Sequence, residues 1–252
     1  MPRQTAIRTA VFAAIALMLA TGVVVAQEAT VLERARAAYA ARADEAQAKA
    51  AVELFAEAAK ADAQSYEARW LGAAAAYYYG TYPREEAPDK EKMAIFQGGI
   101  DLAKEAVTIN PKGVEGHFWL GVLYGVYGEA KGIMKSLALV PDIKQEMQLC
   151  LDADPAVEGW GPDRVLGRMF FKLPFFKGGD KKKSIEHLER SLAGAPTNAL
   201  TRVYLAASYK SEGMKDKARE QCLHVLEMQP DPRWEPEHPW VKRQAEALLK
   251  KL

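Results

Sequence analysis

The feature that most constrains the fold is a glycine-containing apolar stretch, GHFWLGVLYGVYG, which runs from Gly116 to Gly128. Within it, Leu120 and Tyr124 fall one turn apart on the same face of a helix, and Gly121 between them lets a second helix approach closely. A recurring signature of this kind predicts an array of paired helices. Related combinations occur at Trp70-Leu71-Gly72, at Leu166-Gly167, and at Leu205-Ala206 with Tyr209.

Prolines give the period of the array. Measured from the motif glycine or Ala206 to the closing proline, successive segments span 39, 34, 29 and 24 residues. The interval between the closing prolines Pro196 and Pro230 is 34 residues, which is the tetratricopeptide period. We therefore predict an all-α, tetratricopeptide-like helical solenoid of about four helix pairs with helical caps, the first three pairs carrying insertions. The closing prolines are Pro111, Pro155, Pro196 and Pro230.

Local signals predict where several helices begin and end. Two capping helices are expected between residues 27 and 61, with a break near residues 42–44. Ser65 is predicted to cap the next helix, and Asp180 to cap the helix after an apolar loop at residues 173–180. Pro141 is expected to break the second helix of the second pair. Residues 231–239 are expected to be irregular, ahead of a terminal helix from Trp240 to Leu252.

The first 26 residues have the composition of a signal peptide. Arg3 and Arg8 precede an apolar run from Ala10 to Val25, and Val24-Val25-Ala26 fits a small-residue cleavage site. We expect an exported, periplasmic protein whose residues 27–252 form a single repeat domain; an uncleaved membrane anchor is the alternative. The formal net charge of +1 gives no general field to attract nucleic acid, so no nucleic-acid partner is expected.

No arrangement of side chains predicts catalysis, a cofactor or a metal site. The four histidines (His117, His187, His224 and His238) are scattered, and none pairs with a cysteine or serine in a nucleophile-activating pattern. Cys150 and Cys222 lie in different repeats and are expected to be separate buried thiols. Gly178-Gly179-Asp180 lacks the G-x-x-x-x-G-K-S/T spacing of a phosphate loop and is interpreted as a turn into a helix.

The candidate binding residues are aromatic and basic side chains on the first helices of the pairs, which line the concave face of such an array. Aromatic anchors beside arginines suit a peptide, or a ligand with an acidic group on an apolar body. The alternative is that many of these aromatics only pack between helices and that the arginines pair with neighbouring carboxylates. Arg164 stands out, because a cation at a helix start opposes the macrodipole. The candidates are Arg69, Trp70, Tyr77, Phe118, Trp119, Arg164, Arg168, Phe171 and Tyr204.

From about Ser65 onward, the chain resembles the T component of TRAP transporters, a group of periplasmic tetratricopeptide proteins. The resemblance implies association with a solute-binding protein, and a trimer with an apolar channel. The chain is similarly close to the regulator of microtubule dynamics proteins. It departs from the lipoprotein form of the T component, because no lipid-attachment cysteine follows the apolar run. The first resemblance rests on Trp119-Leu120-Gly121, Tyr127-Gly128, Arg164-x-x-Gly167, Pro174 with Gly178-Gly179-Asp180, and Ala195-Pro196; the second on Phe118-Trp119, Lys131-Gly132, Ile143-Lys144 and Gly167-Arg168.

We therefore expect a non-catalytic module that binds a protein or peptide partner through its concave face, as an accessory to TRAP-type solute uptake. A periplasmic solute-binding protein and a second copy of the chain are the candidate partners. The alternative is a carrier of a small apolar acid. A closed apolar cavity around Trp70, Trp119 and Phe171 would favour the small ligand, whereas an open channel would favour a peptide or protein.

Overall fold

The computed structural model describes residues 29–252 of the chain. The predicted signal peptide, residues 1–26, lies outside the described residues. Within residues 29–252 the structure contains α-helices and short 3-10 helices and no strand, which confirms the predicted all-α fold. No helix of this described part combines the length and the apolar composition that a membrane span needs.

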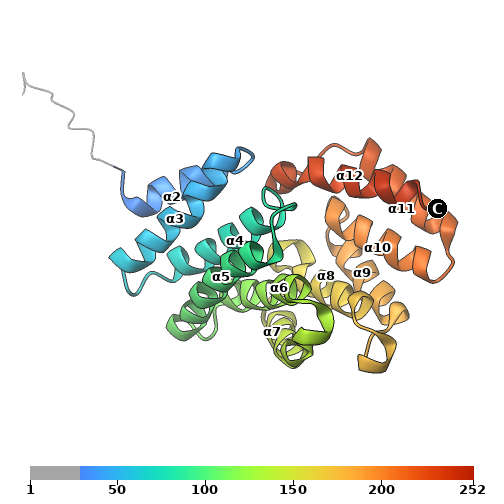
Figure 1. Ribbon diagram of the computed structural model, residues 1–252, viewed down its shortest axis with the longest axis horizontal. Helices are drawn as coiled ribbons and strands as arrows, with labels where there is room; N and C mark the ends of the chain where they lie inside the picture. Colours follow the sequence, from blue (N-terminus) through green and yellow to red (C-terminus); the bar gives the residue numbers. More distant parts are fainter. Residues whose placement is uncertain (1–28) are drawn as a thin grey trace, which may run out of the picture. The chain divides into compact units, whose positions relative to one another are not determined.

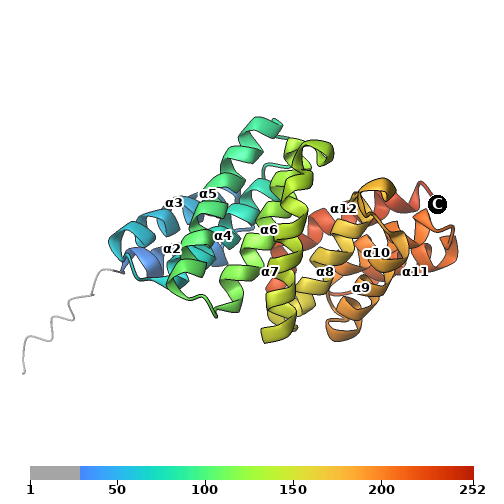
Figure 2. The same ribbon diagram turned by 90° about the horizontal axis from the view of Figure 1, so that it is seen from below.

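The helices of the compact unit Val31–Leu252 pack in sequence order, each against the next (Figure 1). The pair α6 and α7 lies side by side in both views (Figures 1 and 2). Four tetratricopeptide-like pairs, α4 with α5 through α10 with α11, are flanked by the pair α2 with α3 and by α12. The α-helices are α2 Val31–Ala40, α3 Glu45–Ala61, α4 Tyr66–Thr81, α5 Asp89–Ile109, α6 Val114–Lys131, α7 Val140–Ala153, α8 Val157–Lys172, α9 Lys181–Gly194, α10 Ala199–Ser211, α11 Lys215–Glu227 and α12 His238–Leu249; the 3-10 helices are η1 Ile133–Leu139, η2 Phe175–Lys177 and η3 Pro232–Glu237.

The motif glycines lie where paired helices come closest. A Cβ atom added to Gly121 on α6 would clash with the Met147 side chain of α7, and one on Gly167 of α8 would lie 2.6 Å from Leu188 Cγ of α9. Ala206 takes the same position in α10 and is fully buried. The spacing that predicts helix pairing therefore identifies the interhelical contacts correctly.

Helix caps follow the predicted signals. The Ser65 hydroxyl accepts a hydrogen bond from the backbone N–H of Ala68 at 3.2 Å, as expected for an N-cap. The Asp180 carboxylate accepts from the N–H groups of Lys182 and Lys183 at 3.0 and 3.1 Å. The Gly178-Gly179-Asp180 segment is therefore a turn into α9, as the sequence indicates.

Two local expectations are wrong. Pro141 does not break a helix; it occupies the first turn of α7, where its missing N–H costs no intrahelical hydrogen bond, and η1 precedes it. Residues 231–239 are not irregular either. The Asp231 carboxylate accepts from the N–H of Arg233 and caps η3, and α12 already begins at His238.

Candidate functional site

Two adjoining cavities lie among the first helices of the pairs. We call the one of about 130 Å³ the apolar cavity and the one of about 460 Å³ the polar cavity. Tyr77, Trp119, Arg164 and Leu200 contribute to the walls of both, so the cavities share a partition. Because these residues come from α4, α6, α8 and α10, the repeat itself positions the partition.

The apolar cavity is walled by the first helices and by the insertion of the second pair. Phe118 and Trp119 meet edge to face, with ring centroids 5.1 Å apart, and form one wall from α6. Residues of η1 and the start of α7 supply further apolar side chains, so the insertion predicted at residues 134–141 builds part of the cavity. The remaining apolar lining includes Val122, Val126, Ile133, Leu139, Val140, Ile143, Val165, Met169, Leu173 and Tyr204.

Charged groups at this cavity are unequal in number. Glu129 pairs with Arg168 (Nε to Oε1, 3.2 Å) and with Lys172 (Nζ to Oε2, 2.8 Å), so two cations share one carboxylate. The Arg168 guanidinium also lies over the Tyr204 ring, 4.5 Å from its centroid. Burial would raise the pKa of the Glu129 carboxyl, but the two cations lower it below its ordinary value. The carboxyl group therefore stays ionised and balances only one of its two cations, and Arg164 adds a third cation to the lining of this cavity.

Arg164 is tied to an unusual backbone turn. Glu158, Gly159 and Trp160 adopt left-handed conformations, with φ of 49°, 63° and 57°, which is strained for the two non-glycine residues. The Arg164 guanidinium donates to the carbonyl oxygens of Glu158 and Gly159 at 3.0 and 3.1 Å. These carbonyl bonds explain why a cation is tolerated at this helix start. Arg164 thus stabilises the turn and lines both cavities.

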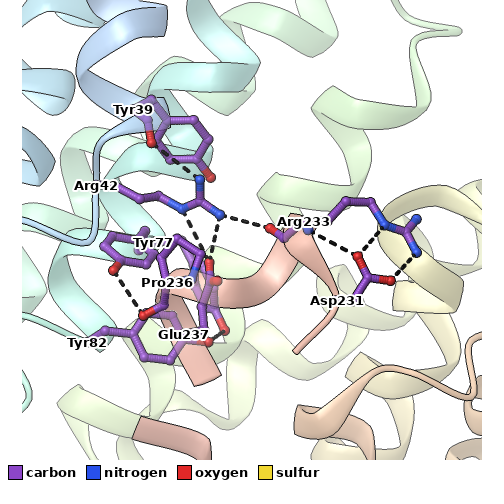
Figure 3. A network of polar contacts seen from close by, with 9 residues as sticks. Tyr39, Arg42, Tyr77, Tyr82, Asp231, Arg233, Pro236 and Glu237 are labelled. Carbon is purple, nitrogen blue, oxygen red and sulfur yellow. Dashed lines mark hydrogen bonds and ion pairs between the residues drawn. The ribbon is translucent and has the colours of Figure 1, made fainter. Parts of the chain in front are cut away.

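A network around Arg42 forms one side of the polar cavity (Figure 3). The Arg42 guanidinium donates to the Glu237 carboxylate at 3.2 Å and to the Arg233 carbonyl at 2.9 Å, and it lies 4.6 Å from the centroid of the Tyr39 ring. Burial raises the pKa of the Glu237 carboxyl, and the Arg42 charge offsets only part of that rise. The second oxygen of Glu237, Oε2, is buried without a hydrogen-bond partner.

Contacts of the C-terminal segment with the N-terminal helices enclose this cavity. The Trp240 ring of α12 packs edge-on against Tyr82, which follows α4, at 5.3 Å, and Arg243 pairs with Glu85 at 3.3 Å. Sequence reasoning missed this closure, because no periodic pattern relates residues that lie more than 150 positions apart. The wall residues it missed include Tyr39, Arg42, Tyr78, Tyr82, Glu158, Asp231, Arg233, Trp234, Glu237 and His238.

Most of the predicted binding residues line one or both of the two cavities, and two of them do not. Trp70 lines the polar cavity, while Arg69 and Phe171 line neither cavity. Arg69 is buried, and it pairs with Glu105 at 2.8 Å and donates to backbone carbonyls. The Lys181 ammonium lies over the Phe171 ring, 4.0 Å from the centroid of that ring. The predicted binding residues that line the apolar cavity are Tyr77, Phe118, Trp119, Arg164, Arg168 and Tyr204.

The two cysteines are buried, and two of the four histidines have carboxylate partners. Cys150 and Cys222 are separate buried thiols, as expected, and burial raises their pKa values to about 12 and about 11. His117 bonds to Glu146 at 2.6 Å, and His187 bonds to Asp163 at 2.7 Å. Across residues 29–252, no group of three or more metal-ligating side chains comes together.

Comparison with known proteins agrees with this architecture. The family model of regulator of microtubule dynamics protein 1-3 matches residues 31–158, slightly more than half of the chain. A crystal structure of a thermophilic TPR protein from Thermus thermophilus is similar over 88% of this chain and 100% of that chain, with 18% identity and a TM-score of 0.64.

Two further solved structures show weaker similarity. MamA has 13% identity and a TM-score of 0.41 over 82% of this chain and 91% of that one. A monomeric mutant of IFIT1 with Gppp-AAAA has 16% identity and a TM-score of 0.41 over 88% of this chain and 58% of that one. No curated protein matches the sequence significantly. Of these structures, only the thermophilic TPR protein is similar enough to support the fold, and at 18% identity it supports the fold alone.

Proposed function

The chain belongs to the regulator of microtubule dynamics protein 1-3 family, and we propose that it is an exported, non-catalytic binding module. Export is supported by the signal-peptide composition of residues 1–26. Its tetratricopeptide-like fold is of a kind that commonly binds protein or peptide partners. The observation that supports the proposal is the apolar cavity among α4, α6, α8 and α10. A partner would bind on the face that these first helices build.

The size of the apolar cavity favours one side chain of a partner over a whole small molecule. Its volume of about 130 Å³ is close to that of an engineered cavity of about 150 Å³ that accommodates benzene. Small-molecule sites usually occupy about 300–1,000 Å³. A single leucine, methionine or phenylalanine side chain of a bound segment would fill the cavity and exclude water from Phe118 and Trp119.

The charges beside the cavity favour an acidic group close to that side chain. Arg168 and Lys172 share Glu129, so a partner carboxylate would gain an uncompensated cation. We therefore propose that the partner offers an extended segment in which an apolar residue neighbours an aspartate or glutamate. The resemblance to the T component of TRAP transporters makes a periplasmic solute-binding protein the partner to test first.

A second candidate function is a carrier of a small apolar acid. It is favoured by the polar cavity, whose volume of about 460 Å³ is within the range of small-molecule sites and which shares Arg164 with the apolar cavity. Such a ligand would place its apolar body against Trp119 and Tyr77 and its carboxylate towards the guanidinium. A bound molecule of this kind would be recovered with the purified protein.

Site-specific photo-crosslinking in the source cells separates these functions. A photoreactive residue at Val126, which lines the apolar cavity, should give a crosslinked protein product, whereas one at Ala94, exposed on α5, should not. Native mass spectrometry of residues 27–252 purified from the same cells would detect a retained small molecule or a homo-oligomer. A small molecule together with no crosslink at Val126 would favour the carrier function.

A further inference from the structure

Two adjacent phenylalanine side chains project from the turn between α8 and α9. Phe175 and Phe176 in η2 are 90% and 73% exposed, more than any other large apolar side chain in residues 29–252. Exposed aromatic pairs are costly in water and mark interaction surfaces. Neither residue lines the apolar or the polar cavity, so the proposed function leaves this pair unexplained.

The turn that presents them is held by its own backbone. The N–H of Gly179 donates to the Pro174 carbonyl at 3.0 Å, and the N–H of Asp180 donates to the Phe170 carbonyl at 3.1 Å. Gly178 has φ of 88°, a left-handed conformation that favours glycine. A side chain at Gly179 would collide with the Leu173 carbonyl. The exposure of the phenylalanines is therefore a property of the folded turn.

Lysines flank the phenylalanine pair in the sequence, and the Lys177 ammonium lies 5.9 Å from the centroid of the Phe176 ring. Residues 172–183 contain five lysines and one acid, Asp180, whose carboxylate is used in capping α9. Three of these lysines occupy the first turn of α9, where the helix macrodipole disfavours cations. Among the described residues, no carboxylate pairs with Lys177, Lys182 or Lys183. The sequence thus keeps a positive charge here that helix stability alone would not select.

We propose that this turn binds the surface of an anionic membrane. The rings of Phe175 and Phe176 would enter the interface between headgroups and acyl chains, and the neighbouring lysines would contact the anionic headgroups. Paired apolar insertion and basic attraction are the two contributions that hold peripheral proteins on such surfaces. Exposed aromatic rings beside several lysines without carboxylate partners in residues 29–252 are complementary to a negatively charged, partly apolar surface.

Vesicle co-sedimentation tests the proposal with residues 27–252, which contain the whole compact unit Val31–Leu252. We expect binding to vesicles of phosphatidylcholine with phosphatidylglycerol, weak binding to phosphatidylcholine alone, and loss of binding at high salt. The double variant Phe175→Ser, Phe176→Ser should lose binding to both vesicle types. The double variant Lys182→Gln, Lys183→Gln should bind anionic vesicles about 25-fold more weakly, at about fivefold per lysine.

A matched control is the double variant Met134→Ser, Leu223→Ser, which removes two other exposed apolar side chains and should bind as wild type. Equal unfolding temperatures would show that the substitutions leave the fold intact. The proposal is overturned if wild type does not bind anionic vesicles, or if the phenylalanine variant binds as well as wild type. Because none of the substituted residues lines a cavity, failure here leaves the proposed function standing.

Discussion

Arg42 and Glu237 lie 195 positions apart in the sequence, and their side chains form an ion pair of 3.2 Å with exposures of only 12% and 13%. Arg42 follows α2, and Glu237 ends η3. This pair therefore joins the first helical cap to the C-terminal segment and encloses the polar cavity from both ends of the compact unit Val31–Leu252.

Removing one member of this ion pair should strongly destabilise the folded protein. We expect Arg42→Met to lower the free energy of unfolding by about 3 kcal/mol, because Glu237 would remain buried without a counter-charge. Arg243→Met is the matched control: its pair with Glu85 is largely exposed, so its loss should cost about 0–1 kcal/mol. Urea unfolding curves measure both. Equal effects of the two substitutions would contradict the role assigned to Arg42.

The cost of Arg42→Met should depend on pH. The pKa of the Glu237 carboxyl is raised in the folded state, so the folded chain retains a proton that the unfolded chain has released. Stability from this group is therefore greatest at acidic pH and falls as pH rises through the folded-state pKa. Without Arg42 that pKa rises further, so the loss of unfolding free energy caused by Arg42→Met should become smaller on acidification. If the difference in unfolding free energy between Arg42→Met and wild type did not change with pH, Glu237 would not be the group left unpaired.

Arg164 should be needed mainly for the backbone turn. We expect Arg164→Gln to lower the unfolding free energy by about 3 kcal/mol, since two charge-assisted hydrogen bonds to the carbonyls of Glu158 and Gly159 are lost. Arg168→Gln on the same helix should cost less, about 1 kcal/mol, because Lys172 still pairs with Glu129, and it should instead weaken partner binding. Thermal unfolding of both variants, with binding measured in parallel, distinguishes these roles.

Gly121 should tolerate no side chain. Gly121→Leu would place its Cβ against the Met147 side chain of α7 and should destabilise the protein by about 1–3 kcal/mol or more. At Gly98 on α5 an added Cβ meets nothing within 4 Å, so Gly98→Leu should be neutral or stabilising. A melting temperature of Gly121→Leu equal to that of wild type would refute the register of the α6–α7 contact.

The two thiols should be unreactive in the folded protein. The pKa values of Cys150 and Cys222 are raised by burial to about 12 and about 11, so few thiolates exist at about pH 8. We expect slow reaction with an aromatic disulfide reagent natively and fast reaction of both thiols in urea. Above about pH 9 the unfolded chain ionises its thiols first, so their contribution to stability falls as pH rises. Rapid native modification would contradict this burial.

The repeat contacts and several helix caps could be predicted from the sequence, whereas the long-range contacts and some local turns could not. The Gly121 contact and the Ser65 cap follow from spacing and residue type, because both act between near neighbours in a repeat. The pairing of Arg42 with Glu237 joins the two ends of the array and leaves no local signal. The left-handed turn at Glu158 and Trp160 is equally hidden, since neither residue type favours that backbone conformation.

The central claim, binding through the apolar cavity, is tested most directly by two matched substitutions. Gly125 lines this cavity, and an added Cβ there meets nothing within 4 Å, so Gly125→Leu should project into the cavity without disturbing the helix pairs. Gly98→Leu makes the same change away from both cavities. We would measure the partner recovered with each variant from the source cells. Loss of the partner with Gly125→Leu alone is the expected result; equal recovery with both variants would contradict the account.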